Sequence, residues 1–92
     1  EQMREIIRIA PRRPEGYLFL ARALLHESAP LDEVQTVTEK GLALAVEPEH
    51  KALGWFLMAD VFNRRHQPDK VSVALRNARM QSSAEKRGSH RD

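Results

Sequence analysis

The sequence predicts an all-α domain, and three observations support this fold class. Apolar residues recur at spacings of three and four, which places them on one face of a helix. Prolines divide the chain at intervals that fit helix boundaries. No stretch alternates apolar and polar residues, and no Asn-Gly or Asp-Gly pair signals a β-hairpin. We therefore expect helices throughout, joined by short turns.

The first two complete helices each carry a stripe of apolar or small side chains. One opens after Pro14 and ends before Pro30, and its stripe is Tyr17, Leu20, Ala21, Leu24 and Ser28. The next begins at or near Asp32, where a carboxylate suits the free backbone N–H groups, and it ends before Pro48. Its stripe is Val34, Val37, Thr38, Gly41, Leu42 and Ala45.

Two more helices follow with the same periodicity. A third runs from Glu49 or His50 to about Arg65, with Trp55, Met58, Ala59 and Phe62 on one face. A fourth opens at Pro68 and Asp69, with a stripe of Val71, Ala74, Leu75 and Ala78.

The two ends of the chain have different patterns. Residues 3–10 are typical of the end of an earlier helix, which Pro11 stops. From Gln81 onward polar residues dominate without apolar periodicity, which predicts that the helix frays and that residues 84–92 form a disordered basic tail.

The first and third helices share one pattern at an offset of 38 residues. Tyr17-x-x-Leu20-Ala21-x-x-Leu24 matches Trp55-x-x-Met58-Ala59-x-x-Phe62, and Pro30 matches Pro68. At an offset of 37 residues, Val34-x-x-x-Thr38-x-x-Gly41 matches Val71-x-x-x-Leu75-x-x-Ala78. A small residue between large ones lets a paired helix approach closely. Each helix pair buries only part of its apolar surface, so the pairs are expected to stack.

This pattern resembles the tetratricopeptide repeat family, whose signature is W-x2-L-G-x2-Y, A-x3-F and a closing proline. The matching residues are Trp55, Met58, Ala59, Phe62, Val71 and Leu75, with Pro11 and Pro48 closing repeats. The resemblance implies antiparallel helix pairs stacked in a right-handed superhelix. Residues 1–83 would form this domain: 1–13 end a preceding repeat, and 14–48 and 49–83 are complete repeats.

Two features depart from the family pattern. The offset of 38 residues exceeds the usual repeat of about 34 by one helical turn. Thr38 and Gly41 also stand where the family prefers a large apolar residue and an alanine. We therefore expect the second helix of the 14–48 repeat to be longer than usual and locally weak.

Catalytic and metal-binding motifs are not found. The chain has no cysteine, no glycine-rich phosphate loop and no HExxH motif. The histidines at 26, 50, 66 and 90 fall at helix ends, turns or the tail, where solvated side chains are more common than metal ligands. A chain of 92 residues also leaves little room for a catalytic cavity. The expected protein is not an enzyme and takes no cofactor, metal ion or small-molecule substrate.

The resemblance implies a functional surface on the first helix of each repeat, which in this family lines a concave groove for extended or helical peptides. The corresponding residues are Leu18, Arg22, Leu25, Leu53, Phe56, Asp60, Asn63 and Arg64. The apolar members of this set could instead pack between neighbouring helices, and Arg22 could pair with Asp60. Asn63 is the best candidate for a polar peptide contact, because its amide both donates and accepts hydrogen bonds.

Some family members clamp a peptide carboxylate with lysine and asparagine. Here Leu18 and Phe56 stand at the lysine position, and Arg22 and Asp60 stand at the first asparagine position. The sequence does not support that chemistry. A mixed groove of this kind fits a hydrophobic or amphipathic segment better.

The expected function is a protein-interaction scaffold or adaptor, as the C-terminal part of a longer repeat protein. One alternative is self-association through an apolar edge formed by Met3, Ile6, Ile7 and Ile9. Another is binding to nucleic acid or an anionic surface through Arg76, Arg79, Lys86, Arg87 and Arg91. Nucleic acid is the weaker prediction, because residues 14–50 are acidic and no aromatic residues accompany the basic cluster.

The cellular location is only weakly constrained by sequence. The longest early apolar stretch, residues 6–10, contains an arginine and stops at Pro11, so it is neither a signal peptide nor a membrane span. We expect a cytoplasmic protein. The alternative is that a targeting segment lies upstream of residue 1.

Overall fold

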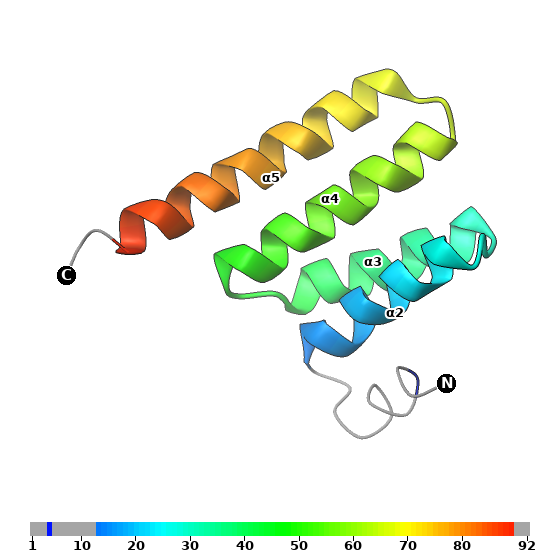
Figure 1. The fold of residues 1–92 in the computed structure, drawn as a ribbon, viewed down its shortest axis with the longest axis horizontal. Coiled ribbons are helices and arrows are strands. Elements are labelled where there is room, and N and C mark those ends of the chain that lie inside the picture. Colours follow the sequence, from blue (N-terminus) through cyan, green and yellow to red (C-terminus); the bar gives the residue numbers. More distant parts are fainter. Residues whose placement is uncertain (1–3, 5–12, 90–92) are drawn as a thin grey trace.

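Four α-helices lie side by side in chain order in the described part of the chain (Figure 1). The computed structural model describes residue 4 and residues 13–89, with side chains up to residue 81. The helices are α2 (Pro14–His26), α3 (Leu31–Leu44), α4 (Pro48–Arg64) and α5 (Pro68–Ser89). These residues contain no strand, so the predicted all-α class is confirmed for this part of the protein.

Proline residues fix where the helices start. Pro14 and Pro48 are the first residues of α2 and α4, where a missing N–H costs no hydrogen bond and a fixed φ suits the helix. Acidic residues stand in the first turn of every helix, close to its positive end: Glu15, Asp32, Glu33, Glu49 and Asp69. The predicted helix starts are therefore correct to within about two residues.

The turns that follow α2 and α4 have the same hydrogen bonds. After α2, Ser28 N–H donates to Leu25 O (3.1 Å) and Ala29 N–H donates to Leu24 O (2.9 Å). After α4, His66 N–H donates to Asn63 O and Gln67 N–H donates to Phe62 O, both at 3.0 Å. Ser28 and His66 have φ of 57° and 60°, as a Schellman turn requires. All these positions differ by 38 residues, so the sequence repeat is also a repeat of backbone structure.

The extra helical turn in the repeat lies at a different place from the one expected. The second helix, α3, has 14 residues and is not extended. Pro48 instead starts α4 four positions before Ala52, the residue that corresponds to Pro14. Because Pro48 is preset for a first helical turn, the added residues lengthen the start of α4.

The last helix is longer than the sequence pattern indicated. We expected fraying from Gln81 and a disordered tail from residue 84, whereas α5 continues to Ser89. Ala84, Glu85, Lys86 and Arg87 all favour helix, so the backbone continues beyond the last apolar residue of the stripe. Residues 90–92 lie outside the described part of the chain.

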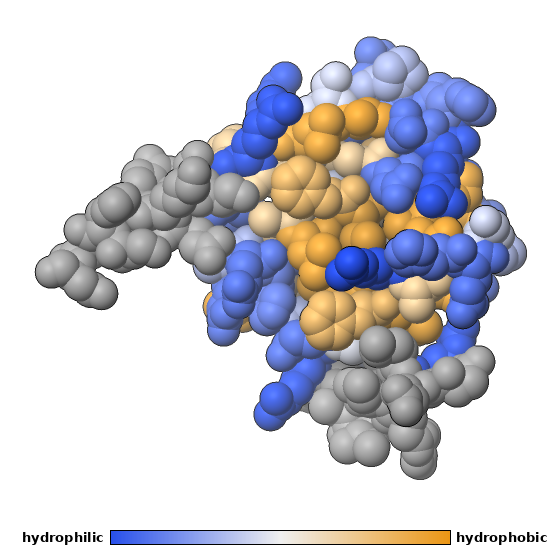
Figure 2. Space-filling model, in the orientation of Figure 1, coloured by the Kyte–Doolittle hydropathy of each residue, from blue (hydrophilic) through white to orange (hydrophobic). Residues whose placement is uncertain are grey.

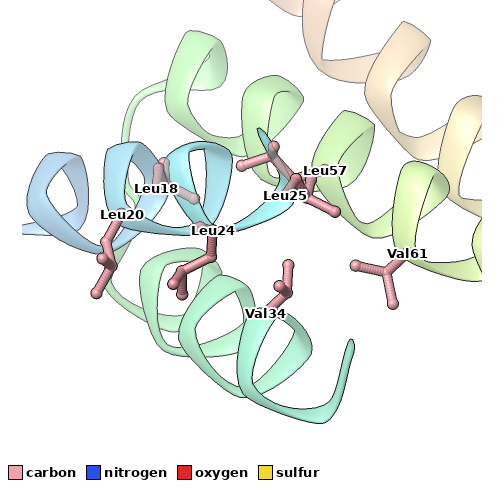
Figure 3. Packing of buried hydrophobic residues seen from close by; sticks show 8 residues of the cluster. Leu18, Leu20, Leu24, Leu25, Val34, Leu57 and Val61 are labelled. Atoms are coloured by element: carbon pink, nitrogen blue, oxygen red, sulfur yellow. The ribbon is translucent and has the colours of Figure 1, made fainter. Parts of the chain in front are cut away.

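The main core fills the space between α2, α3 and α4 (Figure 3). Leu18, Val34 and Val61 are each 0% exposed, and they come from these three helices in turn. Leu25 and Leu57 join the same cluster where α2 faces α4. These contacts fix the position of α2 relative to α4.

Thr38 and Gly41 both fit closely into the packing of α3. Thr38 is fully buried, and its hydroxyl donates to Val34 O at 2.7 Å, so it leaves no polar atom unsatisfied. A Cβ on Gly41 would lie 2.9 Å from Leu18 Cγ and 3.2 Å from Tyr17 Cβ. The absence of a side chain therefore allows α3 to pack closely on α2.

A second cluster joins α4 to α5. Met58, Ala59 and Ala74 are buried, and the partly buried side chains packed against them are Leu42, Trp55, Phe62, Val71 and Leu75.

No helix in the described residues has the length and apolar character required to cross a membrane. Apart from Arg4, whose guanidinium lies 2.7 Å from Glu33 Oε1, the N-terminal segment is outside the described residues. The self-association edge at Met3, Ile6, Ile7 and Ile9 is part of that segment.

Candidate functional site

The surface is hollowed where α2 lies next to α4. The hollow has a volume of about 310 Å³, near the lower end of the range of about 300–1,000 Å³ for ligand pockets. It is lined by Arg22, Leu25, His26, Leu53, Phe56, Leu57, Asp60 and Arg64. These eight residues are called the α2–α4 hollow below.

The base of the hollow is apolar. Leu25 and Leu57 are buried beneath it, Leu53 is half-buried, and the Phe56 ring is 47% exposed beside it. Figure 2 shows hydrophobic side chains gathered over α2 and α4 in the middle of this face, with hydrophilic side chains around them. An exposed aromatic ring beside buried leucines favours contact with apolar side chains of another molecule.

Arg64 holds the two walls of the hollow together. Its Nε donates to Asp60 Oδ1 on the same helix at 3.0 Å, and its Nη1 donates to the Leu25 carbonyl oxygen at 3.2 Å. Leu25 is close to the end of α2, and its carbonyl oxygen also accepts from Ser28 N–H. The bond from Arg64 therefore ties α2 to α4 at the negative end of the helix dipole, which attracts a cation. The positive charge of Arg64 is therefore already balanced within the hollow by Asp60.

Arg22 has no such partner. It is exposed at the rim and forms no ion pair with any residue in the described ranges. The alternative of an Arg22–Asp60 ion pair is not observed, because Asp60 pairs with Arg64. The hollow thus combines an apolar base with one uncompensated guanidinium, which can form charge-assisted hydrogen bonds with a carboxylate.

Six of the eight residues that the sequence suggested line this one hollow: Arg22, Leu25, Leu53, Phe56, Asp60 and Arg64. Leu18 does not, because α4 packs over it and leaves it 0% exposed in the core. Asn63 is exposed but lies outside the lining. The residue expected to make a polar peptide contact is therefore not among those that line the hollow.

Sequence reasoning missed two parts of the surface. Leu57 was overlooked in the base of the hollow because it is outside the apolar stripe of α4 that the repeat pattern defines. A second hollow of about 340 Å³, between α4 and α5, was also missed. It is lined by Trp55, Phe62, Asp69, Lys70, Val73 and Ala74, and Lys70 Nζ lies 5.6 Å from the centroid of the Phe62 ring. Val73, an exposed apolar residue outside the stripe of α5, was the available signal.

Within the described ranges, no three histidine, aspartate or glutamate side chains are grouped as metal ligands would be. No protein-family model, curated protein or solved structure matches the chain. The function therefore has to be inferred from the surface itself.

Proposed function

We propose that the protein is a non-enzymatic interaction module that binds a peptide or helix of a partner protein in the α2–α4 hollow. The observation that carries this proposal is the convergence of six suggested groove residues on one hollow with an apolar base. Peptide recognition by a groove of this kind relies on a few apolar anchors, and one or two charges orient the ligand.

The same proposal includes the architecture. Residues 14–48 and 49–83 are two tetratricopeptide-like repeats that stack in a right-handed superhelix, and residues 1–13 end a preceding one. The identical turns after α2 and α4 support this arrangement. The packing of α4 on both helices of the first pair, through Leu57 and Val61, also supports it. In this architecture the α2–α4 hollow lies on the concave side.

The charges of the hollow define the ligand further. Because Arg64 is paired with Asp60 and Arg22 is not, the hollow has one unpaired positive group. A matching ligand places one or two apolar side chains over Leu53 and Phe56 and a carboxylate near Arg22. A segment with an acidic residue beside its apolar face meets these requirements.

Selection of a displayed peptide library on the immobilised protein, followed by affinity measurements on variants, tests this function. Phe56→Ala is expected to lower the affinity for the selected peptides about tenfold or more, because an aromatic anchor is lost. Arg22→Ala is expected to weaken acidic peptides several-fold, by about 1 kcal/mol, and less at high salt.

Phe19→Ala is the matched control for the aromatic substitution. Phe19 is on α2 and, like Phe56, is an exposed aromatic residue, with 41% of its surface exposed. It does not line the hollow. Its replacement should leave peptide affinity unchanged. If Phe19→Ala and Phe56→Ala weaken binding equally, or if no selected peptide responds to Arg22→Ala, the hollow is not the binding site.

A further inference from the structure

The two helix pairs differ in what covers the side that faces the next part of the chain. In the first pair, Leu18 on α2 and Val34 and Thr38 on α3 are each 0% exposed, and α4 packs over this side. The corresponding residues of the second pair are Phe56, Val71 and Leu75. Phe56 is 47% exposed, and Val71 and Leu75 are only partly buried. We call these three residues the α4–α5 edge.

We propose that the α4–α5 edge binds an amphipathic helix of a partner protein, in the way that the α2–α3 pair binds α4. This inference rests on the repeat arrangement proposed above. The edge shares Phe56 with the α2–α4 hollow, whereas Val71 and Leu75 are outside the lining of the hollow. The interface between the α2–α3 pair and α4 is the template, because it shows which helix chemistry covers such a surface.

The template specifies the apolar face of the partner helix. Gly54, Leu57 and Val61 of α4 face the first pair: a Cβ on Gly54 would lie 2.6 Å from Leu42 Cγ and 3.5 Å from Leu18 Cδ2. A small residue thus meets the large ones, and a leucine and a valine follow at i+3 and i+7 on the same face. The partner helix needs the same small-x-x-Leu-x-x-x-Val spacing.

Charge distinguishes the edge from its template. The positions of Glu39 and Leu42 on α3 correspond to Arg76 and Arg79 on α5. Both arginines are exposed and form no ion pair with described residues. Since Leu42 lies against Gly54, Arg79 would face the same part of the incoming helix. The partner helix is therefore acidic within a turn of its small residue.

Asn63 is next to the α4–α5 edge by its place in the repeat, and it does not line the hollow. It corresponds to Leu25, which is 5% exposed in the cluster that contains Leu57 and Val61. At the edge this position is an exposed asparagine. Its substitution by leucine would restore the residue that the template uses, so Asn63→Leu should improve binding of the helix.

A fluorescein-labelled synthetic peptide with the sequence of residues 47–66, carrying Lys51→Glu, provides the probe. Lys51 precedes Gly54 by three residues, so the glutamate supplies the acidic group on the docking side. Fluorescence anisotropy is expected to show saturable binding to the full chain. Asn63→Leu should tighten it about tenfold, and Arg79→Glu should weaken it about 3–5-fold.

Three controls separate this inference from the function of the hollow. Arg22→Ala should leave peptide binding unchanged, and a peptide that also carries Leu57→Asp and Val61→Asp should not bind. The three substitutions in the protein, Arg22→Ala, Asn63→Leu and Arg79→Glu, are at exposed positions, so circular dichroism should show intact helices. If Arg22→Ala abolishes binding and Asn63→Leu does not change it, the peptide binds in the hollow, and the proposal that it binds at the α4–α5 edge is overturned.

Other outcomes also contradict the inference. No binding at 1 mM peptide (about the weakest affinity that such a docked helix would give) overturns it. So does an Arg79-dependent dimer in sedimentation that excludes the peptide, because a second copy would then be the occupant.

Discussion

Replacing Leu18 with alanine is expected to lower the free energy of unfolding by about 3–5 kcal/mol. Leu18 is 0% exposed and belongs to the cluster that joins α2, α3 and α4, so its loss opens a cavity where three helices meet. Gly41 is packed against its side chain and cannot fill the space. Urea denaturation followed by circular dichroism gives the change.

The neighbouring residue supplies the control for this prediction. Phe19 is larger than Leu18 but 41% exposed, and it is on the same helix. Phe19→Ala should therefore cost about 1 kcal/mol or less. Equal costs for the two substitutions would contradict the position of α2 against α3 and α4, because that position is what distinguishes the two side chains.

Replacing Gly54 with leucine is expected to cost about 3 kcal/mol or more and to separate α3 from α4. Even a Cβ at this position would lie 2.6 Å from Leu42 Cγ, so the rest of a leucine side chain has no space. The gain in helix propensity, about 1 kcal/mol over glycine, is smaller than this steric cost. Thermal denaturation should show a melting temperature lowered by several degrees or more.

Ala43→Leu provides the comparison for Gly54→Leu. Ala43 is on α3 beside Leu42 but is exposed, so the added side chain enters solvent. Its effect should stay within about 0.5 kcal/mol. If Gly54→Leu is tolerated equally well, α3 and α4 do not approach as closely as described, and the template for the α4–α5 edge is lost as well.

Local sequence signals were sufficient to predict the helices and their starts. Pro14 and Pro68 marked where helices begin, because the effect of a proline depends only on the adjacent backbone. Pro48 was expected to close the preceding repeat, whereas it is the first residue of α4. The end of α5 was less predictable. Its last turns have favourable helix propensity but no apolar stripe, and the stripe was the signal on which the expected boundary depended.

The sequence predicted most of the residues that line the hollow, but it did not predict how exposed each one is or what it contacts. Leu18 and Phe56 occupy the same place in the repeat, yet one is buried and the other is 47% exposed. Periodicity assigns both to one helix face, whereas the difference arises because α4 covers only the first pair. From the sequence, Arg64 could equally have faced a ligand. In the structure it donates to the Leu25 carbonyl oxygen on α2, a residue that is 39 positions away in sequence. Such long-range contacts depend on tertiary packing.

The most direct test of the proposed function is an amide chemical-shift map of the ¹⁵N-labelled protein with a selected peptide bound. Binding in the α2–α4 hollow predicts that the largest changes fall in residues 22–26 and 53–64, with small changes in residues 70–74 beside the second hollow. The largest changes in residues 70–81, with α2 unaffected, would contradict the account, because the ligand would then lie on α5 and not between the first helices of the two repeats.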